Sequence, residues 1–469
     1  MPKQPKALYV LFCAELTIRF SYWGLQSLLV LLLTQRFHHT ATFAYHTYGA
    51  FTALAFLFSI MGGFLADRFL GFSKTALLGI SACLLGNLFL ALQLPIGYMF
   101  SLAMIALGTG LFFPNNSNWL GQQYGEQDRR RSKGFTLYYM GTNLGALLGP
   151  IVYGSINHNS PHQTQWVFFC SVGLMLLWGL LFSLTHRCFK LTTEAPRFSR
   201  SHYVWIAILL LGALSFAYYL LLQYTLLGIV LTLIFGMSVV YVIQQSYRLQ
   251  LRLQSSLKLI GLIVFPLIFF TLAFQVGDSL IIFAQHHVAR TVFNHVIPAP
   301  FFASFEPIFI VLMAPILIMI WKKLENSQLY ISETAKISAG FLFTSIAFLC
   351  YYLCTLEAMD NQQASLLLFT TAYLFLAIGE LCIMPPVISM VSEHAPAKLK
   401  GMLMGLLFMS LSFSSYLSAI VANLTNDAQE HSNIVNFSMT YGRIAGFAFI
   451  VSIITIAARQ YYVQHSRTP

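Results

Sequence analysis

The feature that most constrains the fold is a succession of fourteen long apolar stretches that fill most of the 469-residue chain. About 20 apolar residues in a helix cross the hydrocarbon core of a bilayer. Lipid offers the backbone no hydrogen-bond partners, so stretches of this length indicate membrane-spanning helices. We therefore predict an all-α polytopic membrane protein. The predicted spans are 8–34, 44–65, 75–93, 98–119, 135–156, 165–185, 203–222, 225–245, 258–285, 304–322, 337–355, 364–391, 401–423 and 440–463.

Composition excludes an ordinary soluble protein. Hydrophobic residues make up 57% of the chain and charged residues 9%, whereas soluble domains carry about 25% charged residues. The basic start, Met1 to Lys6, resembles the flank of a signal peptide. The apolar stretch that follows is too long for one and lacks a small-residue cleavage site. We therefore expect the first span to be retained.

The net charge of +11 is explained by topology. Of the 26 Lys and Arg residues, only Arg36, Arg290 and Arg443 fall on the outer side, Arg443 at the outer end of the last span, and Arg19 lies in the body of the first span. Positive residues concentrate on the cytoplasmic side of membrane proteins. The pattern predicts both termini in the cytoplasm, and it favours lipid headgroups over nucleic acid as partners of the basic loops.

Nothing in the sequence indicates an enzyme or a bound cofactor. The seven cysteines lie in or beside apolar stretches and form no CxxC pair, so we expect free thiols. The thirteen histidines lack the spacing of metal ligands. No Ser-His-Asp arrangement or pair of catalytic acids is visible. We expect no metal and no cofactor.

The order of the spans indicates two bundles. A polar segment from Arg187 to Arg200 ends the first six spans, and an amphipathic stretch from Tyr247 to Lys258 precedes the last six. We predict an N-terminal six-helix bundle in 1–190, linkers with an accessory helical hairpin in 191–257, and a C-terminal six-helix bundle in 258–469. A six-plus-six arrangement is typical of transporters in which two bundles rock around a site near the membrane midplane.

Two charges stand inside the first span. Glu15 and Arg19, in the segment AELTIRFSYWG, lie four residues apart and therefore on one helical face. An ionised side chain near the bilayer centre costs at least about 2.5 to 3.5 kcal/mol. This face must therefore look into protein or water.

Four stretches of the chain resemble the proton-dependent oligopeptide transporter family (POT, also called PTR) of the major facilitator superfamily, in the form of a divergent prokaryotic member. The first, from Glu15 to Gly24, is similar to the family's ExxERFxYYG signature. The other three are Gly62 to Gly71, like GGxxAD; Gly108 to Asn115 with Gly134 to Ala146, like GTGLFKPN and GFTxFYMGxNLGA; and Gly379 to Gly401, like the GEL...SMV...AP...G stretch.

The resemblance implies roles for several residues. Glu380 would face the ammonium group of a peptide, and Asn143 would bind its backbone, although a polar contact between helices is the alternative for Asn143. The side chains of Tyr22 and Trp23 would line the pocket or simply pack. Gln26 and Gln275 occupy pocket positions, Gln26 where many members have an Arg.

At the inner end of the second span, Asp67 and Arg68 would form a latch between the bundles. The alternative is a charged helix end.

The chain also departs from the family pattern. Ile18 replaces an acid, Phe113 replaces the Lys of FKPN, Phe274 replaces an acid of the seventh family helix, and Phe56 replaces a pocket Tyr. Two acids stand at new positions, Asp278 and Glu306. We expect Glu15, Asp278, Glu306 and Glu380 to carry protons or to serve as counter-ions. Our hypothesis pairs Glu306 with Arg19 when the outer gate closes, with a static pair as the alternative.

The function that the resemblance implies is proton-coupled import of di- and tripeptides by alternating access, across the inner membrane of a prokaryote. Two alternatives remain. One is a transporter of another amine-bearing or peptide-like solute with altered or lost proton coupling, because Gln26 and Phe113 remove the expected cations for a peptide carboxylate. The other is a receptor or scaffold that has kept the fold and lost transport.

Overall fold

The structure is a computed structural model that describes residues 4–93, 97–124, 128, 130–159, 164–189, 200–248, 253–326, 332–394, 397–427 and 433–465. The chain divides into two compact units, which we describe separately. The first unit holds Met1–Leu29 and Ala50–Ile229, and the second holds Val30–Gly49 and Val230–Pro469. The expected boundaries at 190 and 257 remain predictions.

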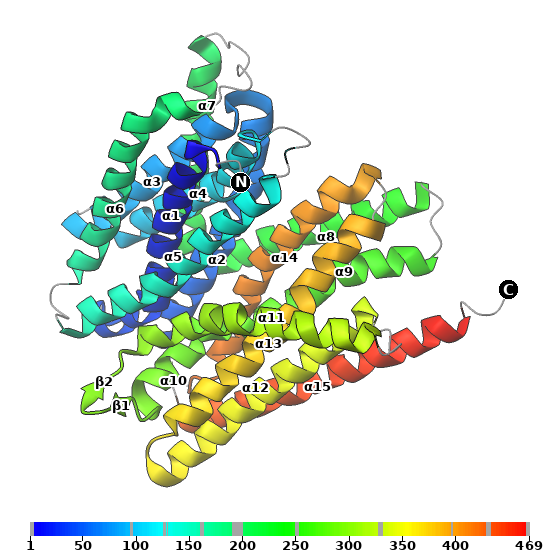
Figure 1. Ribbon diagram of the computed structural model, residues 1–469. Helices are drawn as coiled ribbons and strands as arrows, with labels where there is room; N and C mark the ends of the chain where they lie inside the picture. The colour runs from blue at the N-terminus through cyan, green and yellow to red at the C-terminus, as the bar shows by residue number, and fades with distance from the viewer. Residues whose placement is uncertain are drawn as a thin grey trace. The chain divides into compact units, whose positions relative to one another are not determined.

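The helices follow one another with short connections (Figure 1). The first part of the chain forms α1 (Lys6–Leu31), which continues as a π-helical turn (Leu32–Arg36), α2 (Ala41–Leu65), continuing likewise (Ala66–Leu70), α3 (Phe72–Leu92), α4 (Tyr98–Gly121), α5 (Arg131–Asn159), α6 (Gln165–Thr185) with a 3-10 turn (His186–Cys188), and α7 (Arg200–Leu222).

The remaining part forms α8 (Tyr224–Arg248), α9 (Leu253–Ala273), a 3-10 turn (Phe274–Val276), α10 (Ser279–His287), strands β1 (Thr291–Val292) and β2 (His295–Val296), a 3-10 segment (Ala299–Ser304), α11 (Phe305–Asn326), α12 (Glu333–Asn361), α13 (Leu366–His394), α14 (Ala397–Asn423) and α15 (Ile434–His465).

Within the described residues, 13 helical segments are long and apolar enough to cross a membrane. The fourteenth predicted span, 135–156, lies in α5, which has 29 residues. Polar side chains such as those of Tyr138, Thr142 and Asn143 lower its hydropathy. The predicted span 258–285 is a single apolar segment that the structure divides into α9 and α10.

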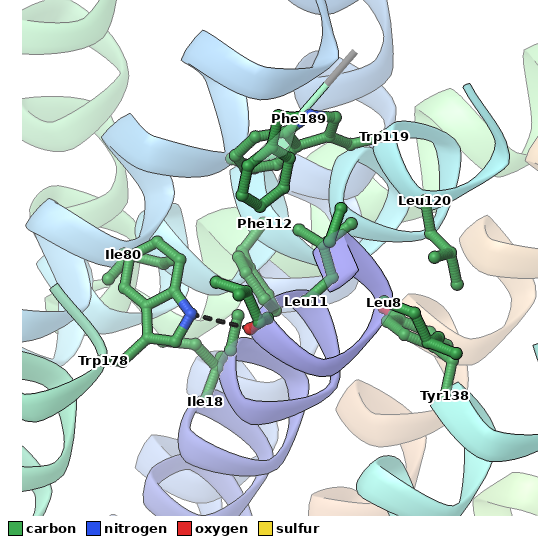
Figure 2. Close-up of a cluster of buried hydrophobic side chains, with 14 of the residues drawn as sticks. Leu8, Leu11, Ile18, Ile80, Phe112, Trp119, Leu120, Tyr138, Trp178 and Phe189 are labelled. Atoms are coloured by element: carbon green, nitrogen blue, oxygen red, sulfur yellow. Dashed lines mark hydrogen bonds between the residues drawn. The ribbon is translucent and has the colours of Figure 1, made fainter. Parts of the chain in front are cut away.

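A hydrophobic cluster in the first unit surrounds the start of α1 (Figure 2). Leu8, Leu11 and Ile18 are almost completely buried. The indole of Trp178 on α6 packs against them, and its Nε1 donates a hydrogen bond to the carbonyl of Val10 at 2.9 Å. Trp119 of α4 closes the cluster near the end of α6. Tyr138 of α5 belongs to this cluster, and its hydroxyl donates a hydrogen bond to Glu15, so the apolar packing adjoins the buried charges of α1.

Three glycines allow α5 to approach α1 closely. Gly141, Gly145 and Gly149 are spaced by four, the pattern by which small residues line the contact between membrane helices. A Cβ atom on Gly145 would lie 2.6 Å from the Cβ of Arg19 and 2.7 Å from the carbonyl oxygen of Leu16. Only glycine fits here, and the close approach brings α5 side chains within reach of the charges on α1.

In the second unit, α12 runs beside both α13 and α15, and α9 packs against α14 (Figure 1). A short antiparallel hairpin of β1 and β2 follows α10, with Thr291 opposite Val296. The guanidinium of Arg290 holds this hairpin by donating to the carbonyls of Ile297 and Gln285, both at 2.9 Å. Burial lowers the pKa of Arg290, because it removes water from the cation.

Candidate functional site

The two charges of α1 belong to one hydrogen-bonded network in the first unit. The Nε of Arg19 lies 2.8 Å from Oε1 of Glu15. Asn116 of α4 donates to Oε2 at 3.0 Å, Thr142 of α5 donates to Oε1 at 3.2 Å, and the hydroxyl of Tyr138 also donates to Oε2. Glu15 is 1% exposed. Its carboxylate therefore has four donors, one of them a cation, as a buried charge requires.

Phe113 supports the other side of Arg19. The guanidinium carbon lies 3.6 Å from the centroid of the Phe113 ring, a cation–π contact worth about 0.5 to 2 kcal/mol. The ring of Phe113 also packs edge-on against Tyr22, with centroids 5.6 Å apart. A Lys at position 113 would instead place a second cation beside Arg19. The structure thus gives a physical reason why Phe113 and Ile18 occur together. Ile18 stands where the family pattern has an acid, and without that acid a Lys at position 113 would have no counter-ion.

The predicted pocket residues of the first unit differ in accessibility. Tyr22 and Gln26 are buried, and Nε2 of Gln26 donates to Thr52 at 2.8 Å. Trp23 is half-buried and contacts Tyr22 edge-on. Asn143 is half-buried and donates to the carbonyl of Tyr139 on its own helix at 2.9 Å. Asn143 and Trp23 thus remain accessible to a ligand, whereas Tyr22 and Gln26 are part of the helix packing.

Asp67 and Arg68 lie in the π-helical turn that ends α2. Both side chains are exposed. Neither forms an ion pair with another described residue. Their predicted role as a latch between bundles stays a prediction.

Two acids of the second unit lie in contact with one another. Glu306 stands in the first turn of α11, and Glu380 stands on α13, five residues before the helix-internal Pro385. Their carboxyl groups are within hydrogen-bonding reach of each other. Two carboxylates so close repel, and the pair is stable when one proton lies between them or when a cation is bound. The sequence-based pairing of Glu306 with Arg19 would join the two units and stays a prediction.

Two tyrosines that sequence reasoning missed lie beside this carboxyl pair. Tyr351 of α12 and Tyr373 of α13 are fully buried, with ring centroids 5.9 Å apart. Tyr373 also contacts Phe305, the residue before Glu306, at 6.2 Å. Neither hydroxyl has a hydrogen-bond partner among the described residues. Both hydroxyls are buried, so in this conformation they add polarity beside the carboxyl pair without an exposed surface for a ligand.

Gln275 and Asp278 occupy the break between α9 and α10. Both side chains are fully buried. The Nε2 of Gln275 donates to the carbonyl and the hydroxyl of Ser418 on α14, at 2.8 and 3.0 Å, and its Oε1 accepts from Ser279 at 2.6 Å. The hydroxyl of Ser418 donates in turn to Asp278 at 2.5 Å. The serine-rich segment 410–418 was the signal in the sequence that could have predicted this polar contact.

No group of three or more His, Cys, Asp or Glu side chains within the described residues could hold a metal ion. The arrangement instead offers carboxyl groups for a proton or an organic cation in the second unit, and a partly exposed guanidinium in the first. Side-chain exposure of Arg19 is 20%. This is the chemistry of binding and release of a small polar solute.

Comparison with known proteins agrees with this chemistry. The chain is 26% identical to the dipeptide and tripeptide permease B of Photorhabdus luminescens over 470 residues, covering 97% of this chain and 96% of the relative. It is 27% identical to the permease of the same name from Xenorhabdus bovienii, covering 96% and 94%.

Among solved structures, one of a peptide transporter POT variant in complex with alafosfalin is 26% identical. It covers 98% of this chain and 95% of that chain, with a TM-score of 0.85. A second, of the peptide transporter POT in complex with sulfate, is 25% identical with the same coverage and TM-score.

These likenesses confirm the major facilitator fold, a multi-pass membrane location and membership in a group of transporters rather than enzymes. The model of the POT family matches residues 74–444, which is most of the chain. The chain belongs to the POT family.

Proposed function

We propose that this protein is a proton-coupled symporter that imports di- and tripeptides across the inner membrane of a bacterium, with both termini in the cytoplasm. The bacterial relatives named as dipeptide and tripeptide permeases support the substrate class. The distribution of Lys and Arg supports the orientation. The observation that carries the proposal is the contact between Glu306 and Glu380.

The carboxyl pair is suited to the α-ammonium group of a peptide. Neither Glu306 nor Glu380 belongs to the fully buried class of residues, and in the proposed cycle the pair binds the ammonium group when the cavity opens. With one proton shared between the two groups the pair carries a single negative charge, which one ammonium group neutralises. The buried, unpartnered hydroxyls of Tyr351 and Tyr373 lie close to this pair and can donate to its carboxyl oxygens when the side chains rearrange.

Proton coupling is energetically sufficient for import. One positive charge that moves inward gains about 2.3 kcal/mol per 100 mV of membrane potential. A tenfold accumulation of a neutral solute needs about 1.4 kcal/mol. A single proton for each transported peptide therefore suffices.

The test is uptake of a radiolabelled dipeptide into vesicles that hold the purified protein, driven by an alkaline interior. We expect accumulation in the wild type and its loss in Glu380→Gln. Glu333→Gln is the matched control, because Glu333 pairs with Lys336 at the start of α12, away from the carboxyl pair. A wild type that shows no gradient-driven uptake, while a reconstituted POT peptide transporter does under the same conditions, would contradict the proposal and favour a scaffold.

A second candidate substrate is a peptide-like amine without a carboxylate. Phe113 and Gln26 stand where the family pattern has cations, and neither side chain is charged. The ring of Phe113 instead stacks against Arg19, and Gln26 is hydrogen-bonded to Thr52, which favours a substrate without a carboxylate. Competition by dipeptides and by their C-terminal amides separates the two substrates. Equal competition favours the amine, and at least tenfold weaker competition by amides favours the peptide.

A further inference from the structure

Asp278 is a buried carboxyl group that the proposed ammonium site does not use. It lies between the 3-10 turn and α10, with φ −92° and ψ −101°, and its side chain does not cap the helix that follows. Its Oδ2 accepts a hydrogen bond from Ser418 at 2.5 Å. Its Oδ1 is buried without a partner among the described residues, and none of the ion pairs of those residues includes it.

The groups that face Asp278 come from three other elements of the second unit. From α2, Tyr48 packs against the neighbouring Gly277, where there is no room for a Cβ atom, and the buried Tyr45 interacts electrostatically with Asp278. From α14 comes Ser418. From α15, the hydroxyl of Tyr441 reaches Ser279 at 3.2 Å.

The titratable groups nearby are therefore tyrosines, which are neutral at physiological pH. The closest imidazole along α2, that of His46, is bound to Asn423 of α14 at 2.7 Å. None of the ion pairs within the described part of the chain places a Lys or Arg against Asp278. An ionised carboxylate buried without a counter-charge costs several kcal/mol, so the observed packing requires a neutral group at this position.

The same packing closes one end of the second unit. Ser415 of α14 donates to the carbonyl of Gly49 at 3.1 Å, Asn426 donates to Thr42 at 3.1 Å, and a Cβ on Gly49 would collide with α14. These contacts join the first half of α2 to the last half of α14 and to the residues that follow it. This is the outer end of the molecule in the proposed orientation.

We propose that Asp278 is a proton-binding site of this transporter, and that its protonation is required for α2, α10 and α14 to close over it. When the outer ends of α2 and α14 separate, water reaches the carboxyl group and it can exchange its proton. Proton binding then favours closure, and proton loss favours opening. This inference rests on the proposed function for its place in the transport cycle, but the coupling itself is a property of the empty protein.

The coupling has a defined slope. When one state binds one proton and the other does not, their ratio changes by up to about tenfold for each pH unit. Because the closed state holds the proton, the open fraction rises with pH. Ionisation of Asp278 thus drives opening, and the effect disappears when position 278 cannot titrate.

A thiol buried in the contact between α2 and α14 reports on this equilibrium. Ser415→Cys places a conservative reporter there, and Thr291→Cys in the exposed hairpin provides a reference thiol that corrects for the pH dependence of the labelling reaction. The rates of reaction with a membrane-impermeant maleimide are measured from pH 5.5 upward, with background labelling of the parent protein subtracted. Asp278→Asn keeps the shape of the side chain and removes its titration.

With Asp278 present, we expect the ratio of reporter to reference rate to rise by up to about tenfold for each pH unit over the titrating range. In Asp278→Asn the ratio should stay low and change less than about twofold over the same range. Ser418→Ala weakens the closed state without removing the carboxyl group, so it should raise the labelling at every pH and preserve the slope. If Asp278 had only a structural role, both variants would change the labelling ratio by a constant factor. The dependence of that ratio on pH would then be the same as in the protein with Asp278.

An unchanged slope in Asp278→Asn would overturn the inference. Failure of the proposed function has a different signature: a wild type that transports no dipeptide, with pH-dependent labelling that still requires Asp278. Loss of both transport and pH-dependent labelling in the wild type would overturn both.

Discussion

The two units bury their acids in different ways. In the first unit, Glu15 has four hydrogen-bond donors, one of which is the cation of Arg19 at 2.8 Å. In the second unit, Asp278 has one donor and an unpartnered oxygen, and Glu380 interacts with another acid, Glu306. A carboxylate that is fully paired is held in place by its partners. Carboxyl groups without cations must exchange a proton or bind a cation when their surroundings change, so the second unit carries the chemistry.

The largest expected effect is on the paired acid. In Glu15→Ala, Arg19 loses its partner inside the membrane and three donors lose their acceptor. Removal of one member of a buried ion pair costs about 3 to 5 kcal/mol of stability. In thermal unfolding measured in detergent, the midpoint temperature of Glu15→Ala should lie well below that of the wild type. A variant as stable as the wild type would show that the network is dispensable, and would remove the contrast between the units.

The next effect concerns the unpaired acids and should appear in binding rather than stability. Glu380→Gln removes the charge that attracts an ammonium group and keeps the size of the side chain. A hydrogen bond to a charged group is worth about 1.5 to 3 kcal/mol, so dipeptide affinity should fall by roughly 10- to 150-fold. Binding measured by microcalorimetry and unfolding measured in parallel check both parts. If Glu380→Gln unfolds at a lower temperature but binds the dipeptide with normal affinity, Glu380 acts in stability and not in binding.

A smaller effect should follow from filling the space between α1 and α5. The Cβ of Gly145→Ala would lie 2.6 Å from the Cβ of Arg19, and overpacking of this kind costs about 1 to 3 kcal/mol. The comparison variant is Gly173→Ala on α6, because no atom lies within 4 Å of a Cβ there. Thermal unfolding should separate the two variants. If they unfold alike, the close approach of α5 does not maintain the network of Glu15.

The smallest effect should come from the ring beneath Arg19. Phe113→Leu removes the cation–π contact and should cost about 0.5 to 2 kcal/mol. Phe113→Lys should cost more by itself and less in combination with Ile18→Glu, because the added acid pairs with the added cation. Unfolding of the two single variants and the double variant forms a mutant cycle. If the stability costs of Phe113→Lys and Ile18→Glu simply add in the double variant, the two positions are independent. That result would contradict our explanation that they changed together.

Much of the fold could be predicted from sequence, because lipid imposes a simple rule on every span. The run of apolar stretches predicted the helices, and the segments around Glu15, Gly108 and Glu380 predicted the family. Span 135–156 was predicted despite its lower hydropathy. The sequence did not reveal the break between α9 and α10, because an apolar run has the same hydropathy whether its helix is continuous or interrupted.

The site was predicted as a set of residue types but not as a set of contacts. The sequence named Glu15, Arg19, Glu306 and Glu380 as membrane-embedded charges. Their partners depend on which faces of distant helices meet, and spacing along one helix does not contain that information. Hence Tyr351, Tyr373 and Ser418 were missed.

The sequence by itself determined that this protein spans a membrane many times, that it carries charges where lipid cannot stabilise them, and that those charges must look into protein or water. The burial energy of apolar helices and the cost of desolvating ions act at the level of each residue, so a single chain displays them. Only the tertiary structure decided which acid is paired and which is not. Pairing depends on contacts at distances of about 3 Å between helices far apart in sequence, and these exist only once the helices pack.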